Sequence, residues 1–205
     1  MLVRVCAVIS LSCSLVALAE QVTVPALTDA EKKKLTEGGV VLHETKPTDN
    51  RGVSAEAFGV VDAAPEEVWP VVRDCEHFSQ FLPSTKKSWK KGEGADAICY
   101  DEIELPFPLT NLWAETKSVT RFEPANHYMR EWSFVKGTYR RNKGSWRVVP
   151  WGDEGKKSLV IYAVDSDPSM LVPDWILRAA QTGSVPKLFE GVRNRVVSLR
   201  KTASP

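Results

Sequence analysis

Alternating apolar and polar positions predict a series of short β-strands along most of the chain. Between residues 55 and 61, every second side chain is small or apolar, which is the period of a strand with one buried face. The alternation recurs after residue 84, where turns containing Gly, Pro and Asn interrupt it. Breaks this close together leave no room for parallel crossovers, so neighbouring strands must run antiparallel. The later strands are expected at 84–90, 97–105, 111–122, 127–135, 144–150 and 158–165.

Short helices are expected on both sides of the first main strand. Thr28 and Glu31 have the spacing of a capping box, which predicts a short helix that two glycines end. Residues 40–44 could form a strand after it. Beyond the first main strand, Pro65 occupies a first-turn position of a second helix, and residues 77–82 form a third.

One long amphipathic helix is expected near the C-terminus, beginning at Pro173. Pro186 cannot donate to the carbonyl one turn earlier, so the pattern also predicts a kink near residues 182–186. Apolar side chains recur at spacings of three and four, which gives the helix one apolar face. This face consists of Val185, Leu188, Val192, Val196 and Leu199.

Together the elements predict an α+β fold, in which a seven-stranded antiparallel sheet curls around the long helix and two short helices follow the first strand. Small side chains on the helix would leave space beneath it, and strand aromatics could line that space as a ligand pocket. A fully packed core is the alternative use of the same aromatics. The lining candidates are Trp113, Trp132, Phe134, Tyr139, Trp146 and Tyr162, together with Trp175, Ile176, Ala179, Ala180 and Gly183 near the helix.

Arg130 is a further candidate for the pocket. By period two it shares a strand face with Trp132, so it enters the cavity if that face looks inward. A buried guanidinium needs an acceptor, because an unpaired charge is costly to desolvate. Asp101, Glu115 or the polar head of a ligand could supply it. The opposite register, with Arg130 in water, is the alternative.

Residues 136–143 read as a loop in which basic side chains flank an aromatic one. Such a loop could make transient contact with anionic headgroups at a membrane surface. A solvated hairpin loop is the alternative. The residues concerned are Lys136, Tyr139, Arg140, Arg141 and Lys143.

Composition and charge narrow the classes of function. The 205 residues carry 27 basic and 26 acidic side chains, a formal net charge of +1. This near-zero charge argues against nucleic acid as the main partner, since a duplex binder needs a basic face. We find no nucleophile elbow, phosphate-binding glycine loop or His-Glu-x-x-His motif, and no cofactor is expected.

The first nineteen residues have the pattern of a secretory signal peptide. Arg4 is their only charge, and an apolar run follows it to Ala17-Leu18-Ala19, with small residues at −3 and −1. An uncleaved anchor and a lipoprotein signal around Cys13 are the alternatives. We expect cleavage after Ala19 and a periplasmic or secreted protein.

After cleavage, Cys75 and Cys99 are the remaining cysteines. They could form a disulfide in an oxidising compartment, although spacing alone does not decide it. No metal site is expected, because the chain lacks a Cys-x-x-Cys pair and its three histidines are scattered.

Several stretches resemble the START-like superfamily, which includes Bet v 1-like proteins and polyketide cyclase/dehydrases. VVDAAPEEVW at residues 60–69 and FLP at 81–83 resemble its opening. VDSDP at 164–168, PDWIL at 173–177 and VPKLF at 185–189 are similar to the last strand and lid helix of lipid-transfer START domains. The resemblance implies a helix-grip fold, a curved sheet that holds the C-terminal helix over an apolar cavity.

We therefore expect a signal peptide at 1–19, an N-terminal extension with a short helix at 20–52 and a START-like domain at 53–201. The expected function is to bind or transfer a hydrophobic ligand, with a lipid as the expected class, as an exported monomer. A polyketide cyclase or aromatase that uses the same cavity is the alternative. Two or more titratable groups that converge in the cavity would favour the enzyme.

N-terminal sequencing of the exported protein should begin at Glu20, because the predicted cleavage follows Ala19. Recovery of only the intact Met1 form, inside the cell, would contradict the export signal.

Overall fold

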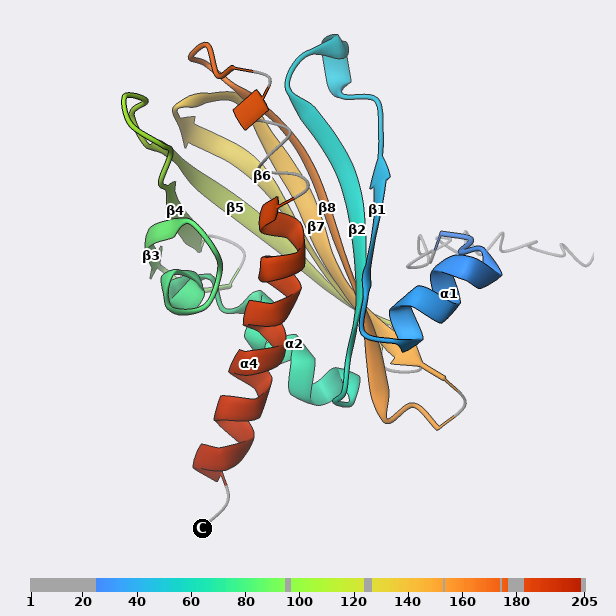
Figure 1. Ribbon diagram of the computed structural model, residues 1–205. Helices are drawn as coiled ribbons and strands as arrows, with labels where there is room; N and C mark the ends of the chain where they lie inside the picture. Colours follow the sequence, from blue (N-terminus) through green and yellow to red (C-terminus); the bar gives the residue numbers. More distant parts are fainter. Residues whose placement is uncertain are drawn as a thin grey trace, which may run out of the picture.

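The computed structural model describes residues 25–94, 97–123, 127–152, 154–173, 175–176 and 183–203. Its centre is one curved antiparallel sheet of eight strands in the order β1-β2-β8-β7-β6-β5-β4-β3 (Figure 1). The strands are β1 (Val40–Glu44), β2 (Val53–Val61), β3 (Thr85–Lys91), β4 (Ile98–Ile103), β5 (Leu112–Glu123), β6 (His127–Gly137), β7 (Tyr139–Trp151) and β8 (Lys157–Pro168).

The chain crosses the sheet once and then returns strand by strand. From β2 at one side, α2 (Pro65–Arg73) and the 3-10 helix η2 (Cys75–Gln80) carry it to β3 at the far edge. Five antiparallel connections then lead back to β8 beside β2. The final helix, α4 (Val185–Ala203), lies across the concave side (Figure 1). The predicted helix-grip architecture is confirmed.

The sheet has eight strands where the sequence predicted seven. The additional strand is β1, which pairs with β2 from Val40↔Gly59 to Glu44↔Ala55. A 3-10 turn, η1 (Thr48–Asn50), lies between the two strands. The segment that we treated as an extension therefore forms an edge of the sheet.

The first helix, α1 (Asp29–Thr36), packs on the outer face of the sheet. It begins with the predicted capping box, in which the Thr28 side chain accepts from the Glu31 amide and Glu31 accepts from the Thr28 amide. Leu35 is fully buried in an outer cluster with Phe58 and strand residues of β7 and β8. Glu31 Oε1 also lies 2.6 Å from Nε2 of His43 on β1, which ties helix to strand.

The prediction of a loop at residues 136–143 is wrong. β6 ends at Gly137 and β7 begins at Tyr139, so only Thr138 separates them. Gly137 makes the sharp reversal with a φ of +147°, and a Cβ there would overlap the backbone of Trp113. A pattern of alternating polar residues hid a strand that is paired with β8 instead of β6. Its basic side chains face carboxylates: Lys136 pairs with Glu115, Arg140 with Asp167, and Arg141 and Lys143 with Asp165.

The terminal helix is described from Val185, and the two residues before it, 183 and 184, are already helical. The kink expected near 182–186 and the residues Ala179 and Ala180 fall in or next to 177–182, which lie outside the described residues. Part of that prediction therefore stays open.

The main core lies between α4, α2 and one half of the concave sheet face. Phe189 and Val192 of α4 are fully buried there. The Phe189 ring lies against Gly59, where a Cβ would overlap it. Gly59 thus allows the helix to approach the sheet closely. Among the described helices, none combines the length and the apolar character that a membrane span requires.

Candidate functional site

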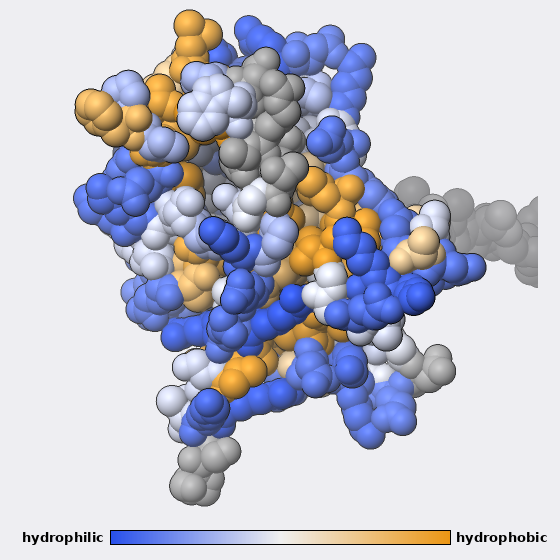
Figure 2. All heavy atoms as spheres, in the orientation of Figure 1, coloured by the Kyte–Doolittle hydropathy of each residue, from blue (hydrophilic) through white to orange (hydrophobic). Residues whose placement is uncertain are grey.

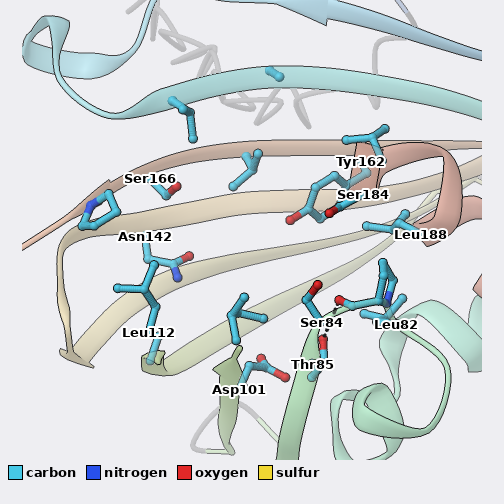
Figure 3. Close-up of a pocket in the computed structure, with 18 of the residues that line it drawn as sticks. Leu82, Ser84, Thr85, Asp101, Leu112, Asn142, Tyr162, Ser166, Ser184 and Leu188 are labelled. Atoms are coloured by element: carbon cyan, nitrogen blue, oxygen red, sulfur yellow. Dashed lines mark hydrogen bonds between the residues drawn. The ribbon is translucent and has the colours of Figure 1, made fainter. Parts of the chain in front are cut away.

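A cavity of about 460 Å³ occupies the other half of the concave face (Figure 3). This volume lies in the usual range for small-molecule pockets. One end, which we call the open end, carries the connection 104–111 and the segment 169–173 after β8 (Figure 1). The inner end is closed by Val185 and Leu188 of α4.

The wall is mainly apolar, with a few polar groups. Small residues on β2, Ala55 and Ala57, leave room opposite the larger side chains of the sheet. The rings of Trp146 and Tyr162 lie 4.6 Å apart on neighbouring strands and form part of the wall. The other groups labelled in Figure 3 that line it are Leu82, Ser84, Thr85, Asp101, Leu112, Asn142, Ser166 and Ser184.

Seven of the predicted side chains line this cavity. They come from β6, β7, β8 and the short segment before α4, so the structure brings together positions far apart in the sequence. Gly144 lies beside Trp132, and a Cβ there would overlap that ring, so the glycine lets the indole lie along the sheet. The seven are Arg130, Trp132, Tyr139, Trp146, Tyr162, Trp175 and Ile176.

Three other candidates do not line it. Trp113 lies on the outer face, because Leu112 and Ala114 hold the inward positions of β5, and it stacks on Tyr100 at 5.9 Å. Phe134 lies beyond the last β6–β7 pair and packs edge-on against Tyr139.

Gly183 is exposed and is not among the residues that line the cavity. Ala179 and Ala180 lie outside the described residues.

Arg130 is buried in the cavity wall, with 4% of its surface exposed. Its Nε donates to Ser118 Oγ at 3.0 Å, and its Nη2 donates to Cys99 Sγ at 3.1 Å. The ring of Phe78 lies 5.6 Å from its Cζ, within cation–π range. The remaining nitrogen, Nη1, is enclosed and has no hydrogen-bond partner among the described residues. The inward register is therefore the observed one.

Asp101 is the carboxylate that acts on Arg130. Burial raises the pKa of Asp101 to about 7, and the attraction of Arg130 opposes this rise. Burial likewise lowers the pKa of Arg130 to about 10, against the pull of Asp101. Asp101 is half-buried as a residue, yet its Oδ1 is enclosed and also lacks a hydrogen-bond partner within the described structure. Glu115, the other acceptor considered, pairs with Lys136.

Two tyrosines add hydroxyl groups to the wall. Burial raises the pKa values of Tyr139 and Tyr162, so both remain protonated near neutrality. Trp132 Nε1 donates to Asn142 Oδ1 at 2.9 Å, which satisfies the indole. The cavity thus combines an apolar wall with one enclosed donor, one enclosed acceptor and several hydroxyl groups.

The Cys75–Cys99 disulfide is present and links η2 to β4, with the two Cα atoms 6.0 Å apart. Both cysteines are buried in a small cluster with Phe78. The sequence left this pair open. It indicated Asp101 only as a possible acceptor for Arg130 and not as a residue that lines the cavity.

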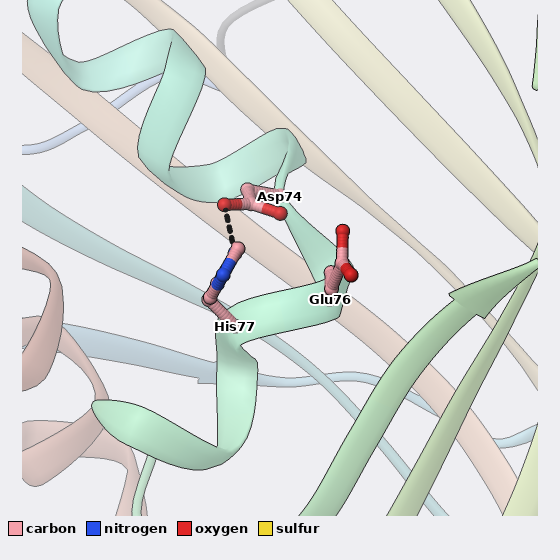
Figure 4. Close-up of side chains that lie close together, drawn as sticks. All are labelled: Asp74, Glu76 and His77. Carbon is pink, nitrogen blue, oxygen red and sulfur yellow. Dashed lines mark hydrogen bonds and ion pairs between the residues drawn. The ribbon is translucent and has the colours of Figure 1, made fainter.

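Asp74, Glu76 and His77 form the one group in the described part of the chain that could hold a metal ion (Figure 4). Their ligand atoms lie within 4.8 Å of one another, and His77 Nδ1 is 2.7 Å from Asp74 Oδ2. All three are partly or fully exposed, and the first and last already satisfy each other. We assign no metal to this group.

The chain is similar in sequence to one curated protein and similar in fold to several solved structures. An uncharacterized protein of Pseudomonas aeruginosa is 26% identical over 113 residues, which span 51% of this chain and only 55% of that protein. The STAR-related lipid transfer protein from Xanthomonas axonopodis superposes with a TM-score of 0.66 at 18% identity, over 78% of this chain and 94% of that one. Human StAR-related lipid transfer protein 5 gives 0.65 at 11% identity, over 80% and 84%.

These structural likenesses show the fold. The family assignment rests on a profile of the polyketide cyclase / dehydrase and lipid transport family, which matches residues 61–193. That range runs from the end of β2 through the cavity strands into α4. The chain is a member of this family.

Proposed function

We propose that the protein binds a lipid or similar hydrophobic ligand in the cavity and carries it through water. The observation that supports this most directly is the apolar cavity with an unpartnered, enclosed Arg130 nitrogen. The solved relatives described as lipid transfer proteins share its fold. Transfer of apolar surface from water into the cavity contributes about 25 cal/mol per Å².

The polar groups define the head of such a ligand. Arg130 Nη1 requires an acceptor, and Asp101 Oδ1 accepts a donor when ionised. A hydroxyl can serve both, whereas an ether or ester oxygen can serve only the arginine. We therefore propose an amphipathic ligand with one small hydroxyl-bearing head and an apolar body.

Export as a monomer is part of the proposal. The signal-like start of the chain supports export, and so does the Cys75–Cys99 disulfide, since such bonds persist mainly in oxidising compartments. Cargo would then be held in the aqueous space outside the cytoplasm.

The open end is the surface we propose for transient contact with a membrane. Phe107 and Leu171 are 96% and 95% exposed, and Trp175 is 62% exposed. Pro106 and Val172, their neighbours in the chain, line the cavity. Figure 2 shows hydrophobic side chains at this end of the molecule. This surface replaces residues 136–143, whose basic side chains are paired with carboxylates.

A second candidate function is acid–base chemistry on a bound ligand. Asp101, Arg130, Tyr139 and Tyr162 are titratable groups that converge on one cavity. A carboxyl with a pKa of about 7 can both take up and release a proton near neutral pH. This is the observation that keeps a cyclase-type reaction as the alternative.

The binding proposal predicts that Arg130→Gln weakens binding of dodecan-1-ol but not of dodecane. A hydrogen bond to a charged group contributes ~1.5–3 kcal/mol, so the loss for the alcohol should be about 10- to 150-fold. Displacement of a fluorescent probe measures both affinities. Arg121→Gln, on the next strand and the opposite face, is the control. Absence of binding by the wild type, or equal losses for both compounds, would contradict the proposal.

The membrane proposal predicts that Phe107→Ser/Leu171→Ser reduces co-sedimentation with phosphatidylcholine vesicles several-fold, because it removes apolar surface that enters the interface. Val119→Ser removes an apolar side chain that is 59% exposed, from the middle of β5, and should have no effect. Unchanged sedimentation of the double variant would rule out this surface.

Asp101 predicts a pH dependence of stability. Its pKa is 3.8 in an unfolded chain and about 7 in the fold, so between these values only the unfolded chain has released the proton. The free energy of unfolding therefore falls as pH rises through this window, by up to ~1.4 kcal/mol per pH unit. Asp101→Asn should remove this slope.

Urea denaturation of wild type and variant at several pH values measures the effect, with Asp29→Asn on exposed α1 as the control. Parallel curves for wild type and Asp101→Asn from pH 4 to 7 would show that the carboxyl is not perturbed, and the acid–base alternative would lose its basis.

A further inference from the structure

The disulfide lies behind the cavity wall, next to Arg130. Cys99 Sγ accepts the hydrogen bond from Arg130 Nη2 at 3.1 Å. The partner Cys75 begins η2, the helix that carries Phe78. Phe78 lines the cavity and places its ring 5.6 Å from the Arg130 Cζ. Cys99 therefore contacts the guanidinium directly, and Cys75 begins the helix whose Phe78 ring lies near it.

Three contacts fix the orientation of this guanidinium. Ser118 binds Nε, Cys99 binds Nη2, and the Phe78 ring lies near the guanidinium carbon. The sulfur contact belongs to the disulfide itself, and Phe78 lies on η2, which the disulfide joins to β4. Nη1 is the nitrogen they leave for another partner.

We propose that the Cys75–Cys99 disulfide is a positioning element of the ligand site, which holds Arg130 with Nη1 available to the polar head of the cargo. The proposal rests on the ligand-binding function proposed above. It assigns the bond a role in selectivity for the head, in addition to the stability that closing a loop provides.

Reduction has a defined chemical consequence here. A dithiol reductant would supply two electrons and two protons, convert the bond to two thiols and itself become a disulfide. At the same time η2 and Phe78 would lose their covalent tie to β4.

A double-mutant cycle tests the proposal. The variants are Cys75→Ala, which leaves the Cys99 sulfur beside Arg130, Arg130→Gln, and the two combined. Affinities for dodecan-1-ol and dodecane are measured for each. We expect Cys75→Ala to weaken dodecan-1-ol about tenfold, to leave dodecane unchanged, and to have no further effect in the Arg130→Gln background.

A purely structural disulfide gives a different result. Cys75→Ala would then weaken both compounds alike, and its effect would add to that of Arg130→Gln, which would overturn the proposal. If the wild type binds neither compound, the ligand-binding function itself fails, which is a distinguishable outcome.

Phe78→Leu covers the case in which Cys75→Ala does not fold, since it retains the disulfide and removes only the ring. Cation–π contacts predict a loss of about 2- to 30-fold for dodecan-1-ol that disappears in Arg130→Gln. An equal loss for dodecane would again contradict the positioning role.

Discussion

The structure depends on how far α4 covers the concave face of the sheet. Where Phe189 packs against Gly59, helix and sheet are in close contact and the interior is filled. Near its described start, the same helix lines the cavity through Val185 and Leu188. Interiors are normally packed without voids, and a space of about 460 Å³ lined by apolar side chains needs an occupant to restore that condition.

Within that space, Arg130 carries a positive charge that the protein satisfies only in part. Its partners are a hydroxyl, a weakly accepting sulfur and an aromatic ring. Asp101 is the carboxylate that most favours the charged form of Arg130, and burial disfavours the ionised form of Asp101 itself. A fully hydrogen-bonded salt bridge would be better for the stability of the empty protein. The arrangement fits the general trade-off in which binding sites retain unsatisfied groups at a cost to stability.

The sequence predicted the architecture, but it did not predict for every strand which side faces inward. Period-two alternation located the strands and put Arg130 and Trp132 on one side, and the capping box located α1. Alternation does not say which side is inward, and residue size misled the assignment of Trp113. That ring is on the outer face because Tyr100 offers it a stacking partner there.

The region 136–143 was missed for a related reason. Its inward positions are polar or aromatic, and its outward charges are matched by Asp165 and Asp167 on β8, more than twenty residues away in the chain. Only the tertiary pairing makes this segment a strand. Asp101 illustrates the same limit, because its raised pKa arises from enclosure by strands that no local pattern reveals.

The pairing of β1 with β2 covers one edge of the sheet. A chain that begins at Val53, where β2 starts, would lose both β1 and Leu35, and β2 would become an edge strand with its outer backbone groups unpaired. Phe58, now fully buried beneath α1, would come to the surface on that same strand. A long edge next to an exposed apolar side chain is a template for pairing with another copy. The first strand and helix therefore cover the β2 edge and the Phe58 side chain, a role separate from ligand binding in the cavity.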